Sequence, residues 1–459
     1  MGKTETRIAE FIIETDPSDM PVESFKAARE ACFDCVGVML AGAAQPHGHM
    51  MAEFVAEEGA RGDCSVLGTA VRTSPSMAAL ANGTLGHALD YDDMGGFGHP
   101  SVVLLPPALA VGERMGISGR ELLSAYIVGY EVGTHLNRGS NYIQGERGFH
   151  STSVFGTLAA TAVACRLLRL SKEQTIMALG IAGSMPSGVL QNFGTHTKPL
   201  HAGLSSRSGV MAALLARKGY LACDNIVESK VGWAAAYMGE GNYDLPAMVK
   251  DLGSVWTSAN SIVIKKYPCC GSNHSTLDSL LGLIREHGFT LDEVDEVEVA
   301  GLPAISHVLL YPDPRSSFQG KFSLAYNVAT ALVDGQINMA SFEGDRVLRS
   351  EYRQALDKVE IKVRSKWDSD YESHPSENPV TVRLKNGRTF TRTTNRHAMH
   401  GTPADPLSQE ELHGKFRQNA RLVLSDEQVE EALRLWWMLD ELPEIGRATA
   451  AVMSGVLVS

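Results

Sequence analysis

The residues best suited to chemistry are concentrated in one stretch, HALDYDDMGGFGHPS, at positions 87–101. This stretch holds two histidines, three aspartates and three glycines. An imidazole exchanges protons near neutral pH, and a carboxylate beside it orients the ring or stabilises its charged form. The pattern therefore predicts proton transfer, with His99 and Asp90 as candidate groups. Asp, Gly and Pro are also ordinary loop residues, and for Asp92 and Asp93 we expect a solvated turn or a capped helix end.

Four other segments place polar, reactive side chains beside small residues at the edges of apolar helices. A lone histidine at a helix start is more often a hydrogen-bonding residue than a base, so each segment has a structural alternative. Together they supply cations and imidazoles in a chain of net charge −12, which suits an anionic ligand. The segments are RGFHSTSVFG with His150; GTHTKPLHAGLSSRSG with His196, Lys198, His201 and Arg207; KKYPCCGSNHS with Lys265, Lys266, Cys270 and His274; and GKFSLAYN with Lys321 and Tyr326.

Most of these candidate residues lie in two regions of the chain whose patterns predict helices. From 1 to 255 the chain is a succession of apolar helices rich in Gly and Ala, and several are apolar on all sides, which is typical of buried helices. After about 402 it is helical again to 459. Ser171 with Gln174 and Ser408 with Glu411 fit capping boxes that open helices. The two regions predict one large helical domain formed by both chain ends.

The region between them, 256–401, has a different pattern. Apolar and charged residues alternate at 294–301 and 358–363, which predicts strands. Asn386-Gly387 between two further alternating runs predicts a hairpin. Helical stretches at 274–288 and 322–335 lie between these strands. The predicted fold class is therefore mainly α with a smaller α+β second domain.

Composition excludes two kinds of partner. The chain has 459 residues, of which 44% are hydrophobic and 20% charged, as in soluble globular proteins. It has no basic run of the kind that binds nucleic acid and no apolar run long enough to span a membrane. The first twenty residues lack the apolar region of a signal peptide, so we expect a cytoplasmic protein.

Metal and cofactor motifs are missing from the sequence. The seven cysteines are scattered, which favours free thiols. Cys32 and Cys35 form the only CxxC and lie at helical spacing, and no second CxxC completes a zinc site. An iron–sulfur hydro-lyase needs three clustered cysteine ligands, which this pattern does not supply. No phosphate-binding loop accompanies the acidic stretch.

Five ordered motifs resemble the MmgE/PrpD family: HALDYDD with GHPS, FHSTSVFG, TKPLHAGLSSRSG, K-x-YPCC with a following His, and SLAYNVATALVDG. The resemblance extends over about 5–450. The family includes 2-methylcitrate dehydratases, cis-aconitate decarboxylases and iminodisuccinate epimerase. It implies a large helical domain, a smaller α+β lid domain, a homodimer, and a site between the domains that needs no metal or organic cofactor.

The resemblance also implies which residues act on a small di- or tricarboxylate. A C–H beside a carboxylate is a very weak acid, so the site needs a base and cations that stabilise the developing charge. We expect His99 and His150 to transfer protons, Lys198 to bind carboxylate and Asp90 to orient an imidazole. Tyr326 is the remaining family position that carries over.

A second group of residues is expected to bind substrate rather than to react. Lys266, Cys270 and His274 lie in the turn that matches the family's K-x-YPCC motif. Arg207 can clamp a second carboxylate, or can form a salt bridge within the helical domain.

The resemblance leaves the reaction open between several family members. The decarboxylase branch carries a threonine and a histidine where this chain has Met94 and Cys270, which disfavours decarboxylation. The GGFG spacer before His99 is shorter than in the methylcitrate dehydratases, which weakens that assignment too. We expect a lyase of the 2-methylcitrate dehydratase type, ahead of an epimerase acting on a dicarboxylate such as iminodisuccinate and of a cis-aconitate decarboxylase. The non-enzymatic alternative is a carboxylate-binding dimer without turnover.

Overall fold

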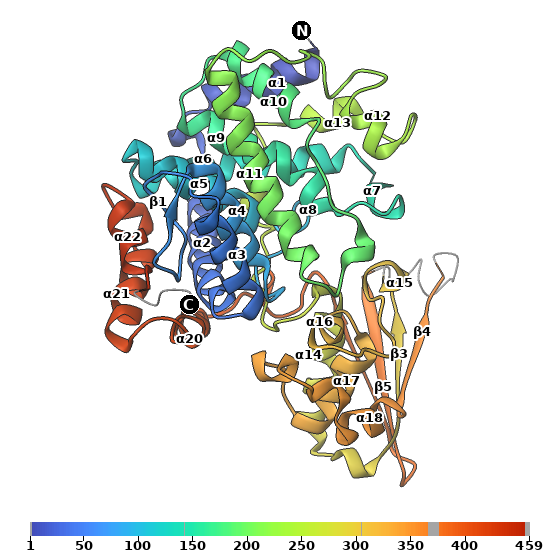
Figure 1. Ribbon diagram of the computed structural model, residues 1–459. Coiled ribbons are helices and arrows are strands. Elements are labelled where there is room, and N and C mark those ends of the chain that lie inside the picture. The colour runs from blue at the N-terminus through green and yellow to red at the C-terminus, as the bar shows by residue number, and fades with distance from the viewer. Residues whose placement is uncertain (1, 142, 304, 366–375, 455–459) are drawn as a thin grey trace. The chain divides into compact units, whose positions relative to one another are not determined.

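The computed structural model describes residues 2–141, 143–303, 305–365 and 376–454. The chain divides into two compact units, which are taken in turn below (Figure 1). Unit 1 comprises Met1–Val189, Thr197–Ile264 and Ser408–Ser459, and unit 2 comprises Leu190–His196 and Lys265–Leu407. Within the described ranges, no helix has the length and apolarity needed to cross a bilayer.

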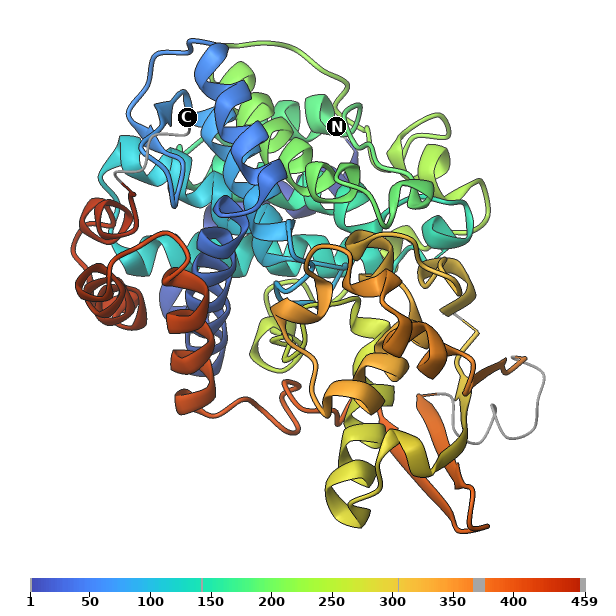
Figure 2. The same ribbon diagram turned by 60° about the horizontal axis from the view of Figure 1, so that its bottom comes forward.

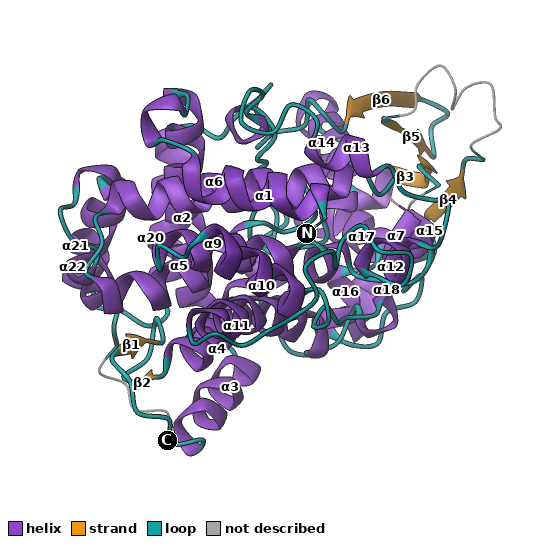
Figure 3. Cartoon of the chain, turned by 90° about the horizontal axis from the view of Figure 1, so that it is seen from above, coloured by secondary structure: helices purple, strands orange, loops and turns teal. Residues whose placement is uncertain are grey.

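The predicted fold class is confirmed, because helices predominate and a small mixed four-stranded sheet accompanies them (Figure 3). The capping boxes expected at Ser171/Gln174 and Ser408/Glu411 are also confirmed, each with reciprocal side-chain to backbone hydrogen bonds. The longer helices of unit 1 are α1 (Lys3–Glu14), α2 (Val22–Ala43), α3 (Pro46–Glu57), α4 (Pro75–His87), α5 (Ser101–Met115), α6 (Gly119–Arg138), α9 (Gly156–Leu167), α10 (Lys172–Ala182) and α11 (Thr197–Arg217). Its shorter elements are α7 (Ile143–Glu146), α8 (Ser151–Val154), α12 (Trp233–Met238), α13 (Leu245–Val249) and the hairpin β1 (Cys64–Ser65) with β2 (Arg72–Thr73).

The C-terminal part of unit 1 returns to the N-terminal helices as α20 (Gln409–Ala420), α21 (Asp426–Trp437) and α22 (Gly446–Ala451). Figure 2 shows α20, in red, beside α2, in dark blue. Phe33 of α2 stacks on Phe416 of α20 with ring centroids 4.6 Å apart. Gly37 lets the two helices approach, since a Cβ there would lie 3.1 Å from the Phe416 ring. Chain segments almost four hundred residues apart therefore share one core.

Unit 2 is built on a four-stranded sheet of order β4-β3-β5-β6. Strand β3 (Val294–Gly301) pairs in parallel with β4 (Val359–Val363) and antiparallel with β5 (Glu377–Leu384), which pairs with β6 (Thr389–Asn395). The predicted hairpin at Asn386-Gly387 is confirmed, and Gly387 has a φ of 87°, which favours glycine.

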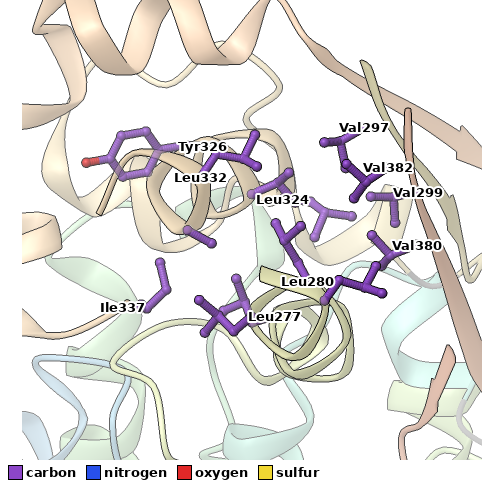
Figure 4. Close-up of a cluster of buried hydrophobic side chains, with 14 of the residues drawn as sticks. Leu277, Leu280, Val297, Val299, Leu324, Tyr326, Leu332, Ile337, Val380 and Val382 are labelled. Atoms are coloured by element: carbon purple, nitrogen blue, oxygen red, sulfur yellow. The ribbon is translucent and has the colours of Figure 1, made fainter. Parts of the chain in front are cut away.

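The two longest helices of unit 2 pack their apolar faces against this sheet. They are α14 (His274–His287) and α17 (Leu324–Asp334), and the shorter helices are α15 (Ile305–Val308), α16 (Ser317–Lys321) and α18 (Ser350–Leu356). Leu277 and Leu280 of α14 and Leu324 of α17 lie in the same buried cluster as Val297 of β3 and Val382 of β5 (Figure 4). Alternation along β5 buries every second residue, as its sequence pattern predicts.

Candidate active site

Eight polar side chains of unit 1 meet around the end of α4, and seven of them are buried. They come from α4 itself, from the loop that joins α4 to α5, from the start of α8 and from the first turns of α11. His99 is the most accessible of the site's ion-paired side chains, with 15% of its side chain exposed. The eight residues are His87, Asp90, Asp92, Asp93, His99, His150, Lys198 and His201.

Two glycines determine how closely α4 and α11 pack. A Cβ on Gly83 would lie 2.9 Å from the Gly203 Cα, and a Cβ on Gly203 would lie 2.3 Å from the Leu80 carbonyl oxygen. Only glycine permits this approach. His87 follows Gly83 by one helical turn, and Lys198 precedes Gly203 by about one turn, so the close packing brings these two side chains into contact.

The loop after α4 contains a tight turn that returns His99 toward α4. Gly95 and Gly98 exchange backbone hydrogen bonds of 2.9 Å, and their φ angles are 143° and 126°. The His99 amide then donates to the Thr152 hydroxyl of α8 at 3.1 Å. Earlier in the loop, Asp90 has a φ of 51°, a left-handed conformation that costs a non-glycine residue about 1–3 kcal/mol. Tertiary contacts must therefore hold this loop in place.

Lys198 is the buried cation of the site. Its side chain is 2% exposed, and its Nζ lies 2.9 Å from Asp90 Oδ1 and 2.8 Å from His87 Nε2. The ammonium group has only hydrogen-bond donors, so it donates to both atoms. His87 Nε2 therefore accepts, and the proton of a neutral His87 lies on Nδ1. Burial lowers the pKa of His87 to about 4, which agrees with a neutral ring at physiological pH.

Asp92 joins two imidazoles. Its Oδ1 lies 2.9 Å from His87 Nδ1, and its Oδ2 lies 3.0 Å from His99 Nδ1. Burial opposes ionisation of this carboxyl, but His87 and His99 outweigh burial and hold its pKa well below the usual range. His99 Nδ1 also lies 3.1 Å from the Asp93 carbonyl oxygen. Both neighbours of Nδ1 are acceptors, so Nδ1 carries a proton and Nε2 is the nitrogen that can gain or lose one.

A second imidazole pair adjoins the first. His150, the residue before α8, has its Nδ1 3.2 Å from Nδ1 of His201, and its ring lies 6.2 Å from the ring of His99. Burial, followed by the charge of Lys198, holds the pKa of His150 well below its usual range and lowers that of His201 to about 4. Both rings are therefore neutral near pH 7, and each presents a donor and an acceptor nitrogen.

The solvated turn expected for Asp92 and Asp93 is wrong, because both side chains are fully buried. Asp93 Oδ1 accepts a hydrogen bond from the Ser101 amide at the start of α5, so the helix-capping alternative holds for this residue. His87, Asp92 and His201 had no predicted role of their own. The sequence held one signal of this burial, which is that apolar residues stand beside the acidic ones. Leu89 and its neighbours are core residues in the structure, and a run that holds core residues does not face solvent.

Asp93 provides a test of this burial. Burial, followed by the charge of Asp92, raises its pKa from 3.8 to about 8, so the folded state binds this proton more tightly than the unfolded state. The associated stabilisation is complete at low pH and is lost as the pH rises toward about 8. Asparagine keeps the acceptor for the Ser101 amide and does not ionise. We expect the melting temperature of Asp93→Asn to fall less than that of the wild type between about pH 5.5 and pH 8.5, as followed by circular dichroism. Parallel declines would contradict a protonated Asp93.

The site also contains donors that metals use, and the lysine occupies the space between two of them. The Lys198 ammonium lies between His87 Nε2 and Asp90 Oδ1, so a metal ion that uses these atoms must displace it. Two sets of donors in this site have ligand atoms within 4.8 Å of one another: His87, His99 and His150; and His87, Asp90, Asp92 and His99.

We expect the lysine to serve as the cation of this site. Dialysis against EDTA should leave turnover unchanged, with metal content checked by elemental analysis of the same sample. Loss of activity that Zn²⁺ or Mg²⁺ restores would contradict this prediction.

Four of the residues expected to react or to bind substrate belong to unit 2. Tyr326 is fully buried in the apolar cluster of that unit, and its hydroxyl donates to the Ser341 carbonyl at 2.6 Å (Figure 4). These contacts give Tyr326 a packing role, and the proposed catalytic group does not include it. His274 is buried beside Tyr267, with ring centroids 5.1 Å apart. Lys266 lies over the same tyrosine ring at 5.4 Å, and Cys270 is partly buried. Substrate contact by Lys266, Cys270 and His274 stays a prediction.

Arg207 lies on α11 but not with the site. It follows Lys198 by nine residues, which at about 100° per residue is half a turn around the helix. His201 follows Lys198 by three residues and therefore faces the same side as the lysine. Helical spacing thus separates Arg207 from the cluster of eight, and both of its expected roles, carboxylate clamp and salt-bridge partner, stay predictions.

Comparison with known proteins identifies relatives over nearly the whole chain. The family model for the MmgE/PrpD N-terminal domain matches residues 6–246, and that for the MmgE/PrpD C-terminal domain matches residues 267–440. Cis-aconitate decarboxylase of Mus musculus is 31% identical over 395 residues, which covers 81% of this chain and 77% of that protein. Cis-aconitate decarboxylase-like protein oryM of Aspergillus oryzae is 27% identical, covering 94% and 93%. Cis-aconitate decarboxylase of Aspergillus terreus is 27% identical, covering 93% and 91%.

Proposed function

The chain belongs to the MmgE/PrpD family, and from that premise we propose a cofactor-independent lyase that transfers a proton at the carbon beside a carboxylate of a small tricarboxylate. The observation that carries the proposal is the ordered set Asp92–His99 beside the ammonium group of Lys198. It combines a proton-transfer group with a buried positive charge. These are the two requirements of bond cleavage next to a carboxylate.

His99 is the acid and base of the proposed mechanism. Asp92 holds its Nδ1–H, so the imidazole keeps one tautomer and directs Nε2 to the reacting carbon. Nε2 removes a proton from that carbon, or returns one to it, while Asp92 stabilises the imidazolium that forms in between. Nε2 lies 3.7 Å from Asp90 Oδ1, so the same imidazolium also has a second carboxylate nearby.

Lys198 supplies the positive charge. When a proton or CO₂ leaves, the electron pair that remains is delocalised onto the adjacent carboxylate, and the ammonium group offsets the added charge. The low dielectric of the buried site makes this interaction stronger than it would be in water. Asp90 keeps the ammonium in position before the substrate enters.

For the substrate we favour cis-aconitate, because the relatives named above are cis-aconitate decarboxylases. In that reaction a C–C bond to one carboxylate breaks, CO₂ departs, and His99 in its imidazolium form protonates the carbon that keeps the electron pair. Dehydration of a 2-methylcitrate-type hydroxy acid is the second candidate. It is supported by Met94 and Cys270, which depart from the residues expected of decarboxylases.

Proton NMR in D₂O distinguishes these reactions. The purified protein is incubated separately with cis-aconitate, 2-methylcitrate, citrate and the iminodisuccinate stereoisomers. Decarboxylation gives a lighter acid with deuterium at one carbon, dehydration gives an unsaturated acid that has lost one C–H of the hydroxy acid, and epimerisation gives a second diastereomer with exchange. Protein carrying Lys198→Met, prepared in parallel, is the control for contaminating activity. Ligand-induced changes in the protein without turnover of any acid would contradict the proposal and favour a carboxylate-binding protein.

A further inference from the structure

We propose that Lys415, in the C-terminal segment of the chain, is a positioning residue that holds the Asp90–Asp92 loop in its working conformation. The activity readout of this proposal rests on the proposed function. Lys415 lies on α20, and its ammonium group donates to Asp34 Oδ2 and to the Tyr91 carbonyl oxygen. It acts through Tyr91, the residue between Asp90 and Asp92.

The contacts of Lys415 join three distant segments of unit 1. Its Nζ lies 2.8 Å from Asp34 Oδ1 on α2 and donates to the Tyr91 carbonyl at 3.0 Å. The same ammonium lies 3.8 Å from the centroid of the Tyr91 ring. The side chains of Lys415 and Asp34 are 5% and 1% exposed. One buried cation thus holds both the backbone and the side chain of Tyr91.

The position of Tyr91 explains why this contact matters for the site. On one side, Asp90 adopts its left-handed conformation and pairs with Lys198. On the other side, Asp92 orients the two imidazoles. A shift of the Tyr91 backbone would move both carboxylates together. A misplacement of about 1 Å in a catalytic group can cost roughly 10²-fold in rate.

A purely structural ion pair would have a different consequence. Buried ion pairs can often be replaced by neutral groups with little loss of stability, whereas removal of one partner leaves a buried charge. Neutral replacement of both Lys415 and Asp34 removes the charge problem but leaves the Tyr91 carbonyl without its donor. The double variant therefore distinguishes the two roles of Lys415, which are pairing with Asp34 for stability and holding Tyr91 for activity.

The experiment compares Lys415→Met, Asp34→Asn/Lys415→Met and Arg417→Met. Arg417 lies on the same helix and forms a half-exposed pair with Glu430, so it is the matched control. We expect the double variant to melt close to the wild type, with kcat lowered roughly 10- to 100-fold and KM changed less than about threefold. Arg417→Met should keep the wild-type kcat. Wild-type kcat in a folded double variant would overturn the proposal.

A second readout does not require turnover. Nitrogen-15 NMR of histidine-labelled protein reports the protonation of each ring nitrogen. In the double variant, the resonances of His87 and His99 should move away from those of a hydrogen-bonded Nδ1–H, and in Arg417→Met they should not. Unchanged histidine resonances in the double variant would overturn the proposal even if no substrate has been found. If only the proposed function is wrong, the wild type will not turn over the acids, but the histidine resonances will still differ between the double variant and the wild type.

Discussion

Replacement of Lys198 by methionine is expected to lower kcat/KM by about 10²–10³-fold or more, the range for removal of a preorganised charge-stabilising group. Methionine fills a similar volume but cannot offset the charge that develops on the substrate carboxylate. The same change removes the donor to His87 Nε2 at 2.8 Å. The proton of His87 is then no longer restricted to Nδ1, the nitrogen that faces Asp92. The measurement is steady-state kinetics with the acid that NMR identifies.

Two controls make the Lys198 result interpretable. Lys198→Met leaves Asp90 as a buried carboxylate without its cation, so Asp90→Asn/Lys198→Met is measured beside it. The double variant should regain thermal stability but not activity. Lys218→Met makes the same chemical change at an exposed lysine just beyond α11 and should keep wild-type kinetics. More than about a tenth of wild-type activity in Lys198→Met would refute its electrostatic role.

The second large effect is expected from His99→Gln. Positioned proton transfer contributes about 10²–10⁴-fold, and we expect kcat to fall within that range. The glutamine amide can donate a hydrogen bond to Asp92 but cannot take up or release a proton. Deuterium incorporation from D₂O should fall with kcat, because both depend on the same nitrogen. His49→Gln, an exposed histidine on α3, is the matched control.

Asp92→Asn tests how His99 is oriented. Asp92 Oδ1 accepts from His87, and its Oδ2 lies 3.0 Å from His99 Nδ1, whereas an asparagine amide nitrogen can only donate. One imidazole must then present a lone pair at Nδ1, which moves its proton to Nε2. We expect kcat to fall by about 10²-fold or more, which is the lower end of the range for loss of a catalytic base, and we expect the fold to be retained. Activity in Asp92→Asn together with inactivity of His99→Gln would mean that His99 works without this carboxylate.

The two histidines expected to transfer protons, His99 and His150, are adjacent in space but not equivalent. His99 is partly exposed and has both of its Nδ1 neighbours as acceptors. His150 is buried and its Nδ1 contacts another imidazole. This difference favours His99 as the group that meets the substrate and gives His150 the role of shaping the site beside it.

Much of the architecture followed from local patterns in the sequence. Alternation of apolar and charged residues predicted the strands at 294–301 and 358–363, and Asn386-Gly387 predicted the hairpin. Such features depend on residues that are close in the chain, so they can be predicted without knowledge of the fold. The candidates Asp90, His99, His150 and Lys198 were likewise selected by residue type and motif, and the structure brings them together in one cluster.

The sequence by itself determined the fold class, the capping boxes and hairpin, and the residues of matching chemistry. Only the tertiary structure decided which of those residues share a site. Asp92 and Asp93 have the same type and adjacent positions, yet one is an ionised bridge between imidazoles and the other is held in its protonated form. Burial makes that difference, together with the groups that each carboxyl meets: two imidazoles for Asp92 and the Ser101 amide for Asp93. The cation that pairs with the neighbouring Asp90 comes from α11, 108 residues away in the chain. Spacing along a sequence carries no information about such partners until the helices pack.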